Sequence, residues 1–106
     1  MAWEQQIVEQ YGDEYIYRQL AEEAAELCQA SLKRVRSMRR ETPVTEKEAH
    51  ARLLEEIADV YVMLGILELE MLSEQDIERI YDIYQAKKDR MIDRMIEGEC
   101  LDSDGR

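Results

Sequence analysis

Apolar residues recur along the chain at intervals of three and four, the spacing of one face of a helix. No segment alternates Val, Ile or Thr with polar residues as a strand does, and the chain holds only one proline and four glycines. The breaks in the pattern fall at Gly12, around Pro43 and at Ser73. The pattern predicts a short helix or extended lead-in over residues 3–11, followed by helices over about 13–40, 45–72 and 73–98.

The starts of the last two predicted helices carry a capping signature. Thr45 precedes Glu48 by three residues, and Ser73 precedes Asp76 by the same interval. At this spacing the side chain of each residue can bond the backbone N–H of the other. We therefore predict an all-α fold, an antiparallel helical bundle of about four helices.

The third predicted helix is apolar on two opposite sides. One side carries Ile57, Val60, Tyr61 and Leu64, and the other carries Val62, Met63, Ile66 and Leu69. A helix of this kind is expected to be buried all round. The chain has the length of a single domain, predicted over residues 1–99 with a disordered tail over 100–106. Because so small a domain covers little surface, we expect dimerisation to complete the bundle.

Carboxylates interrupt the apolar stripes of the second and third predicted helices. The stripe of the second is formed by Ile16, Leu20, Leu27 and Ala30. At 100° per residue, Glu23 falls inside this stripe and Glu26 on its shoulder, whereas Glu22 points outward. In the third helix Asp59 shares the stripe of Met63, and Glu56 lies one turn earlier.

If these two helices pack antiparallel across the loop at Pro43, the four carboxylates of Glu23, Glu26, Glu56 and Asp59 converge. Leaving an ionised carboxylate unpaired in an apolar place costs on the order of several kcal/mol, so each must be neutralised, paired or bound to a metal. Oxygen donors alone favour a hard divalent cation, Mg²⁺ or, in its place, Mn²⁺.

The same carboxylates could instead be neutralised by ion pairs within the chain. Arg18, Arg52 and Lys33 are the nearest cations. Two other metal centres have ligand requirements that the chain does not meet. A di-iron site would need Glu-x-x-His steps, and His50, the only histidine, has Lys47 three residues before it. Zinc would need a Cys/His set that the chain does not provide.

Composition narrows the class of protein. Charged residues make up 37% of the chain and the formal net charge is −11, which argues against binding to nucleic acid or to anionic membranes. The longest apolar run is too short to span a bilayer, and the first residues do not resemble a secretion signal. Cys28 and Cys100 are isolated, as expected for reduced thiols. We therefore expect a cytoplasmic protein.

Basic residues gather at the end of the second predicted helix. They are Lys33, Arg34, Arg36, Arg39 and Arg40. Favourable interaction with the negative end of the helix dipole accounts for some of them. An anionic ligand, an acidic partner chain or simple solvation could account for the rest.

The two pairs of carboxylates, one on each of the second and third predicted helices, belong to a longer sequence pattern. Glu22, Glu23 and Glu26 form EEAAE, and Glu56 and Asp59 form the ends of EIAD. The flanking segments are IVEQYGDE, LLEEIADVYVMLGIL and KKDRMIDRMIEGE. Together, over about residues 5–99, they resemble the MazG-like all-α nucleoside triphosphate pyrophosphohydrolases, the superfamily that includes the dimeric all-α dUTPases.

This resemblance implies an enzyme that cleaves a (d)NTP to a nucleoside monophosphate and pyrophosphate with a metal-activated water. By analogy, Glu23, Glu26, Glu56 and Asp59 would be the catalytic residues and would hold Mg²⁺. The family fold is a helical bundle completed as a dimer, often as a dimer of dimers. The alternative from another class is a non-catalytic acidic helical interaction module, such as an adaptor or an antitoxin-like dimer.

The resemblance also suggests substrate contacts. Lys87, Arg90 and Arg94 match its closing K-x-x-R-x-x-x-R segment and would bind phosphates, although they could equally be the basic last turns of an exposed helix. Trp3 could stack on the base or pack the lead-in. Ile16 stands where many relatives carry a polar residue, so the preferred base or sugar stays open.

Overall fold

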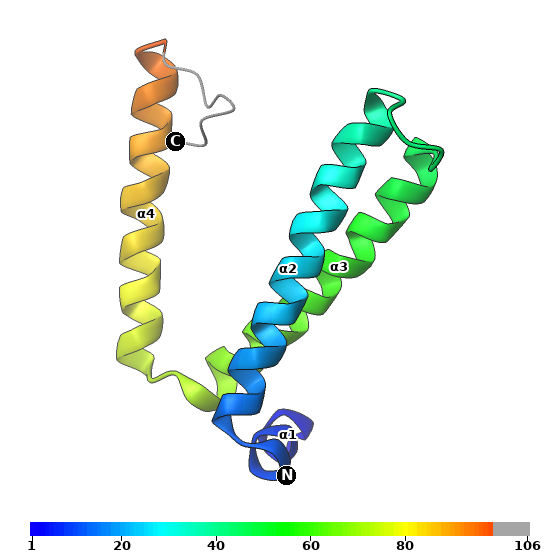
Figure 1. Cartoon of the computed structure of the whole chain (residues 1–106). Helices are drawn as coiled ribbons and strands as arrows, with labels where there is room; N and C mark the ends of the chain where they lie inside the picture. The colour runs from blue at the N-terminus through cyan, green and yellow to red at the C-terminus, as the bar shows by residue number, and fades with distance from the viewer. Residues whose placement is uncertain (99–106) are drawn as a thin grey trace. The chain divides into compact units, whose positions relative to one another are not determined.

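The computed structural model describes residues 1–98, which are helical almost throughout and contain no strand (Figure 1). Its elements are α1 (Trp3–Tyr11), α2 (Asp13–Met38), α3 (Glu46–Ile66), a short π-helical segment η1 (Leu67–Met71) and α4 (Glu74–Ile96). The predicted all-α class and the number of helices are therefore confirmed. The tail predicted over residues 100–106 lies outside the described residues.

The chain divides into two compact units, one over Met1–Met71 and another that begins at Leu72. The first unit holds α1, α2, α3 and η1, and the second holds α4. The single domain predicted over residues 1–99 stays a prediction.

The helix boundaries follow local sequence. Gly12 separates α1 from α2 with φ of 85°, a left-handed conformation that glycine adopts without strain. Before α4 the capping box is complete: the Asp76 N–H donates to Ser73 Oγ, and the Ser73 N–H donates to Asp76 Oδ2, both at 3.0 Å. The helix predicted to reach about Arg40 ends at Met38, because Arg40 adopts φ of 58°.

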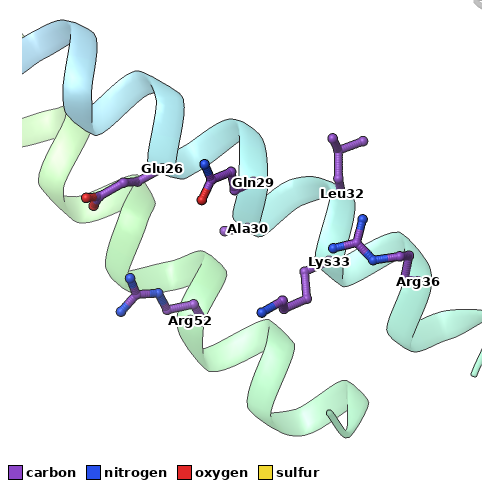
Figure 2. Close-up of a pocket in the computed structure, with 7 residues that line it drawn as sticks. All are labelled: Glu26, Gln29, Ala30, Leu32, Lys33, Arg36 and Arg52. Atoms are coloured by element: carbon purple, nitrogen blue, oxygen red, sulfur yellow. The ribbon is translucent and has the colours of Figure 1, made fainter. Parts of the chain in front are cut away.

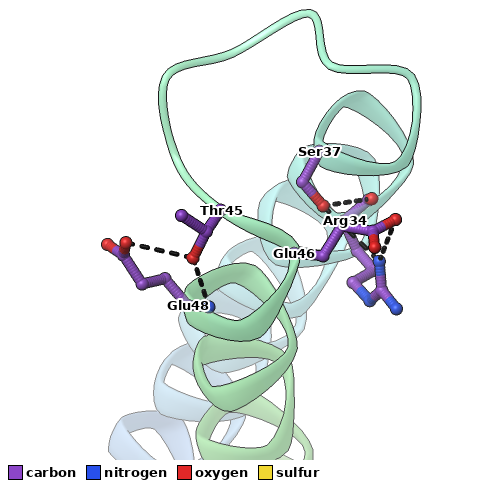
Figure 3. A network of polar contacts seen from close by, with 5 residues as sticks. All are labelled: Arg34, Ser37, Thr45, Glu46 and Glu48. Atoms are coloured by element: carbon purple, nitrogen blue, oxygen red, sulfur yellow. Dashed lines mark hydrogen bonds and ion pairs between the residues drawn. The ribbon is translucent and has the colours of Figure 1, made fainter.

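The α2–α3 loop is fixed by polar contacts at both of its ends (Figure 3). Thr45 Oγ1 accepts a hydrogen bond from the Glu48 N–H at 3.1 Å and donates to Glu48 Oε1 at 3.1 Å, so only half of the predicted capping box forms. Arg34 Nη1 lies 3.8 Å from Glu46 Oε1, and Ser37 Oγ donates to the Arg34 carbonyl at 2.7 Å. These contacts hold the start of α3 against the end of α2.

α2 and α3 lie side by side and antiparallel, which the sequence predicted (Figure 1). Apolar side chains buried in the described residues are few: Ile16, Ala30, Ala49, Met63, Ile66 and Leu67. Ile16 and Ala30 come from the stripe predicted for α2, and Leu20 and Leu27 of that stripe are half-buried. The hairpin of α2 and α3 thus has a thin core.

Within the single chain α3 is not buried on every side, and its burial by a second copy stays a prediction. Tyr61 is 70% exposed and Leu69 is 64% exposed, while Val62 and Leu64 also face solvent. Only Met63 and Ile66 of the predicted stripes are fully buried. The physical reason is that α2 covers one side of α3 and the first unit contains no other long helix to cover the opposite side.

α4 exposes apolar side chains as well. None of its residues is buried, and Tyr81, Tyr84, Met95 and Ile96 are among its exposed large side chains. Among the described residues, no helix combines the length and apolar character needed to cross a bilayer.

Candidate metal centre

Four carboxylates converge between α2 and α3. One oxygen from each of Glu23, Glu26, Glu56 and Asp59 lies within 4.8 Å of the others. Each helix supplies two of them at an i,i+3 spacing, which places both on one face. We call this group the carboxylate cluster. The convergence expected from the helical wheel and the antiparallel packing is present in the structure.

The antiparallel register explains the pairing across the two helices. Glu26 with Glu56 and Glu23 with Asp59 are each symmetric about residue 41, in the loop that joins α2 to α3. Two antiparallel helices joined by a short loop bring such symmetric positions to the same height. Each acid of α2 therefore faces an acid of α3.

The cluster is sheltered on one side only. Glu56 is 2% exposed and is among the most deeply buried side chains of the described residues. Glu23 is half-buried, whereas Glu26 and Asp59 are exposed. The cluster therefore has a buried floor and a rim that is open to solvent.

Two oxygen atoms at the buried side have no protein partner. Glu23 Oε2 and Glu56 Oε2 are inaccessible to solvent and accept no hydrogen bond from any described residue. A buried carboxylate oxygen without a donor is unfavourable, because the water lost on burial has not been replaced. These atoms favour an external partner, either a proton or a cation.

Burial and neighbouring charges act together on the two sheltered carboxyls. The pKa of Glu56 is raised above the ordinary 4.5 by burial and by Glu26, with which a protonated Glu56 can share a hydrogen bond; Arg52 opposes this rise. The pKa of Glu23 is likewise raised by burial and then by the negative charges of Glu26 and Asp59. Glu23 and Glu56 therefore hold a proton more tightly than isolated carboxyls do.

Intrachain ion pairs neutralise only part of the cluster. Arg52 Nη2 lies 2.9 Å from Glu56 Oε1, so this pair, one of the alternatives raised by the sequence, does form. Arg18 instead pairs with Glu14 at 2.6 Å. Among residues 1–98 no ion pair reaches Glu23, and the cluster keeps more negative than positive charge.

The donor atoms of the cluster are all carboxylate oxygens. This set suits Mg²⁺ or Mn²⁺, whereas zinc and di-iron centres draw on Cys or His ligands. His50 is exposed near the start of α3, as expected, and Cys28 is an exposed free thiol on α2. The chemistry of the donors therefore fits a hard divalent cation.

The residues proposed to contact substrate lie on other elements. Lys87, Arg90 and Arg94 occupy i, i+3 and i+7 of α4 in the second unit, and Trp3 is 53% exposed on α1. Their roles in substrate binding stay predictions.

Sequence reasoning missed a pocket next to the cluster. Its lining includes Gln29, Lys33 and Arg36 of α2 together with Glu26 and Arg52 (Figure 2). The signal was the spacing of Glu26, Gln29, Lys33 and Arg36, which places them on one face of α2. Lys33 and Arg36 belong to the basic group at the end of α2, for which an anionic ligand was one of several explanations left open by the sequence.

Comparison of the chain with protein-family models, with curated proteins and with solved structures finds no match. Its function is therefore inferred from the geometry of the carboxylate cluster and from the residues around it.

Proposed function

We propose that this protein is a MazG-like, Mg²⁺-dependent nucleoside triphosphate pyrophosphohydrolase that releases a nucleoside monophosphate and pyrophosphate from a (d)NTP. The observation that carries the proposal is the convergence of four carboxylate oxygens within 4.8 Å, two of the carboxyls having a buried oxygen without a partner. The cytoplasmic location expected from the sequence belongs to the same proposal.

The electrostatics of the cluster support a bound cation. Four carboxylates at this separation repel one another strongly where water is excluded, and Arg52 offsets only one of them. Glu56 and Glu23 would bind the ion through Oε2, the oxygen that has no hydrogen-bond partner in the described part of the chain. Glu26 and Asp59 would complete the set from the exposed rim.

Each part of the cluster then has a distinct task in the reaction. Mg²⁺, when bound, would supply positive charge that polarises phosphate oxygens and lowers the pKa of water. One of the exposed carboxylates, Glu26 or Asp59, would accept the proton that the attacking water loses. Attack by this water breaks the bond between the α and β phosphates, and pyrophosphate leaves. Glu22 is exposed on α2 outside the cluster and is the weakest candidate for the base.

Phosphate and base contacts complete the proposal. Lys87, Arg90 and Arg94 would neutralise charge on the triphosphate, and Trp3, being half exposed, would have a free ring face for a nucleobase. The preferred nucleotide is to be found by assay over all the (d)NTPs.

Self-association is part of the same proposal. Uncovered apolar side chains of α3 and η1 include Tyr61, which is 70% exposed, and Leu69 of η1, which is 64% exposed. Exposed apolar side chains close together on one surface are typical of a surface that another chain covers. We propose that a second copy covers them, giving a dimer or a dimer of dimers.

These uncovered side chains also favour the second candidate function, a non-catalytic helical interaction module. Such a module needs neither metal nor nucleotide, and it would tolerate Asp59→Asn because losing one of four crowded charges relieves repulsion. Substitution at Asp59 therefore separates the two candidates.

The deciding experiment measures pyrophosphate release from each (d)NTP, with added inorganic pyrophosphatase and phosphate detection, in Mg²⁺ and in EDTA. We expect release from at least one nucleotide in Mg²⁺ only. Glu56→Gln and Asp59→Asn should each lower the rate by about 100-fold or more while the helical circular dichroism is kept. Glu55→Gln is the matched control, since Glu55 is exposed beside Glu56 and outside the cluster. Equal rates in EDTA, or no release from any nucleotide, would reject the hydrolase.

A further inference from the structure

A pocket of about 330 Å³ lies between α2 and α3, directly beside the carboxylate cluster. Glu26, Gln29, Lys33 and Arg36 line it from α2, and Arg52 lines it from α3 (Figure 2). Its volume is at the lower end of the range of small-ligand sites, about 300 to 1,000 Å³. The pocket therefore has room for a small molecule or for one part of a larger one.

The pocket is basic although the protein is acidic. Three of its lining residues are cations and one is an acid, in a chain with 25 Asp and Glu against 14 Lys and Arg. Lys33 and Arg36 form no ion pair and no side-chain hydrogen bond with any residue among 1–98. Although carboxylates are in excess in this chain, none among residues 1–98 neutralises these two neighbouring cations. Their positive charge is therefore available to an anionic ligand.

The pocket and the cluster are continuous along α2. Glu26, Gln29, Lys33 and Arg36 follow one another at i, i+3, i+7 and i+10, so a single face passes from acid to base. At 1.5 Å per residue, Lys33 is about 10 Å beyond Glu26 along the helix axis, and flexible side chains can span much of this interval. Ala30, which lies between Glu26 and Lys33 in sequence, is buried and also lines the pocket.

Compensation of the helix dipole explains at most one of the two cations. The dipole acts within the last turn of a helix, and α2 ends at Met38. Arg36 lies in that turn, but Lys33 lies before it. Arg34, which lies between them in sequence, has a carboxylate partner in Glu46 at 3.8 Å. Lys33 and Arg36 both line the pocket, and neither has a carboxylate partner among residues 1–98.

We propose that this pocket is an oxyanion subsite that binds a diphosphate group. Lysine and arginine donate charge-assisted hydrogen bonds to phosphate oxygens, and the amide of Gln29 can add a neutral donor. Aromatic residues are not among its lining residues, so it offers no surface on which a base would stack. This assignment rests on the proposed function in one respect: in the hydrolase the ligand is the terminal diphosphate of the nucleotide and, after cleavage, the released pyrophosphate.

Isothermal titration calorimetry with inorganic pyrophosphate, with and without Mg²⁺, tests the subsite directly. Compared with the wild type, Lys33→Gln/Arg36→Gln should weaken binding by about tenfold or more, because two charge-assisted contacts are lost. The matched control is Arg39→Gln/Lys47→Gln, which removes the same charge near the same end of the hairpin but outside the pocket. It should change the affinity by about twofold at most, in keeping with the screened effect of distant surface charges.

Two further variants keep the test decisive if the first is poorly folded. Gln29→Glu keeps the side-chain size and adds a negative charge to the lining, so it should also weaken pyrophosphate binding. Lys33→Arg/Arg36→Lys keeps both charges and should retain most of the affinity. Orthophosphate, titrated in parallel, should bind more weakly than pyrophosphate; equal binding of the two would reject the assignment to a diphosphate.

Different experimental results would reject the subsite proposal and the hydrolase proposal. Equal pyrophosphate affinities of the pocket variant and its control would overturn the subsite, and turnover of a (d)NTP would then still support the hydrolase. Pyrophosphate binding that depends on Lys33 and Arg36, without turnover of any nucleotide, would support the subsite and reject the hydrolase.

Discussion

Arg52 Nη2 lies 2.9 Å from Glu56 Oε1, one turn along α3, while the second oxygen of the same carboxylate is buried and has no partner among residues 1–98. The guanidinium of Arg52 therefore pairs with one oxygen of the buried Glu56, and it leaves the negative charge of the other carboxylates of the cluster without a compensating cation among residues 1–98. Arg52 also lines the basic pocket, so this one side chain connects the two parts of the proposed site.

Replacing Arg52 should show how far Glu56 depends on the one cation that pairs with it among residues 1–98. Arg52→Met keeps the apolar stem but leaves a buried carboxylate unpaired, so we expect a lower free energy of unfolding at pH 7 and a further rise in the pKa of Glu56. Urea denaturation in EDTA measures the first effect. Glu55→Gln, which removes the exposed pair with Arg52 at 3.7 Å, should change the unfolding free energy by only about 0.5 kcal/mol. Equal losses in the two variants would contradict this assignment.

The raised pKa values of Glu23 and Glu56 predict how metal-free stability depends on pH. In the folded state both carboxyls bind a proton more tightly than in the unfolded chain, so their contribution is complete below the ordinary pKa of 4.5. This stabilising contribution decreases as the pH rises from 4.5 to the folded pKa values. Over this interval the folded state still binds protons that the unfolded chain has released, so each rise in pH favours the unfolded chain. The free energy of unfolding in EDTA should therefore fall above pH 4.5, and Glu56→Gln should reduce this slope. A stability that rises over the same interval in the wild type and the variant alike would contradict the prediction.

Much of the fold could be predicted from local sequence. Gly12, Thr45 and Ser73 act on the backbone within a few residues, so the starts of α2, α3 and α4 follow from them alone. The convergence of Glu23 with Asp59 also followed, because an i,i+3 spacing and a short loop fix which residues face one another.

Features that depend on distant contacts could not be predicted. A helical wheel shows that Asp59 shares an apolar stripe, but only the packed structure shows that this part of the stripe is exposed. The π-helical segment Leu67–Met71 carries no signature distinguishing it from the helix before it. The basic pocket was also missed, since a lysine or arginine near a helix end has a local explanation and its ion pairs depend on the tertiary structure.

Addition of Mg²⁺ should stabilise the wild type, and Asp59 should control this effect. A cation that binds only the folded state raises the free energy of unfolding, by about 2.7 kcal/mol at 100 times its dissociation constant. Asp59→Asn should be at least as stable as the wild type in EDTA, because one negative charge has left the cluster, yet it should gain little from Mg²⁺. Thermal denaturation of both proteins in EDTA and in Mg²⁺ measures the two effects, with Asp13→Asn, outside the cluster, as control. A wild-type melting temperature that is the same with and without Mg²⁺ would exclude a metal at this cluster.

The apolar surface of α3 and η1 should determine the oligomeric state. Tyr61 and Leu69 are 70% and 64% exposed in the single chain, and covering them with a second copy would remove apolar area from water. Sedimentation equilibrium should give the wild type at least twice the chain mass of 12.6 kDa. Tyr61→Glu/Leu69→Glu should shift the protein toward monomer, weakening association by about 100-fold if these residues lie at the centre of the interface. Met38→Glu, an exposed apolar position at the end of α2, is the control and should leave the mass unchanged. A wild-type monomer at every accessible concentration would contradict the proposal that a second copy completes the bundle.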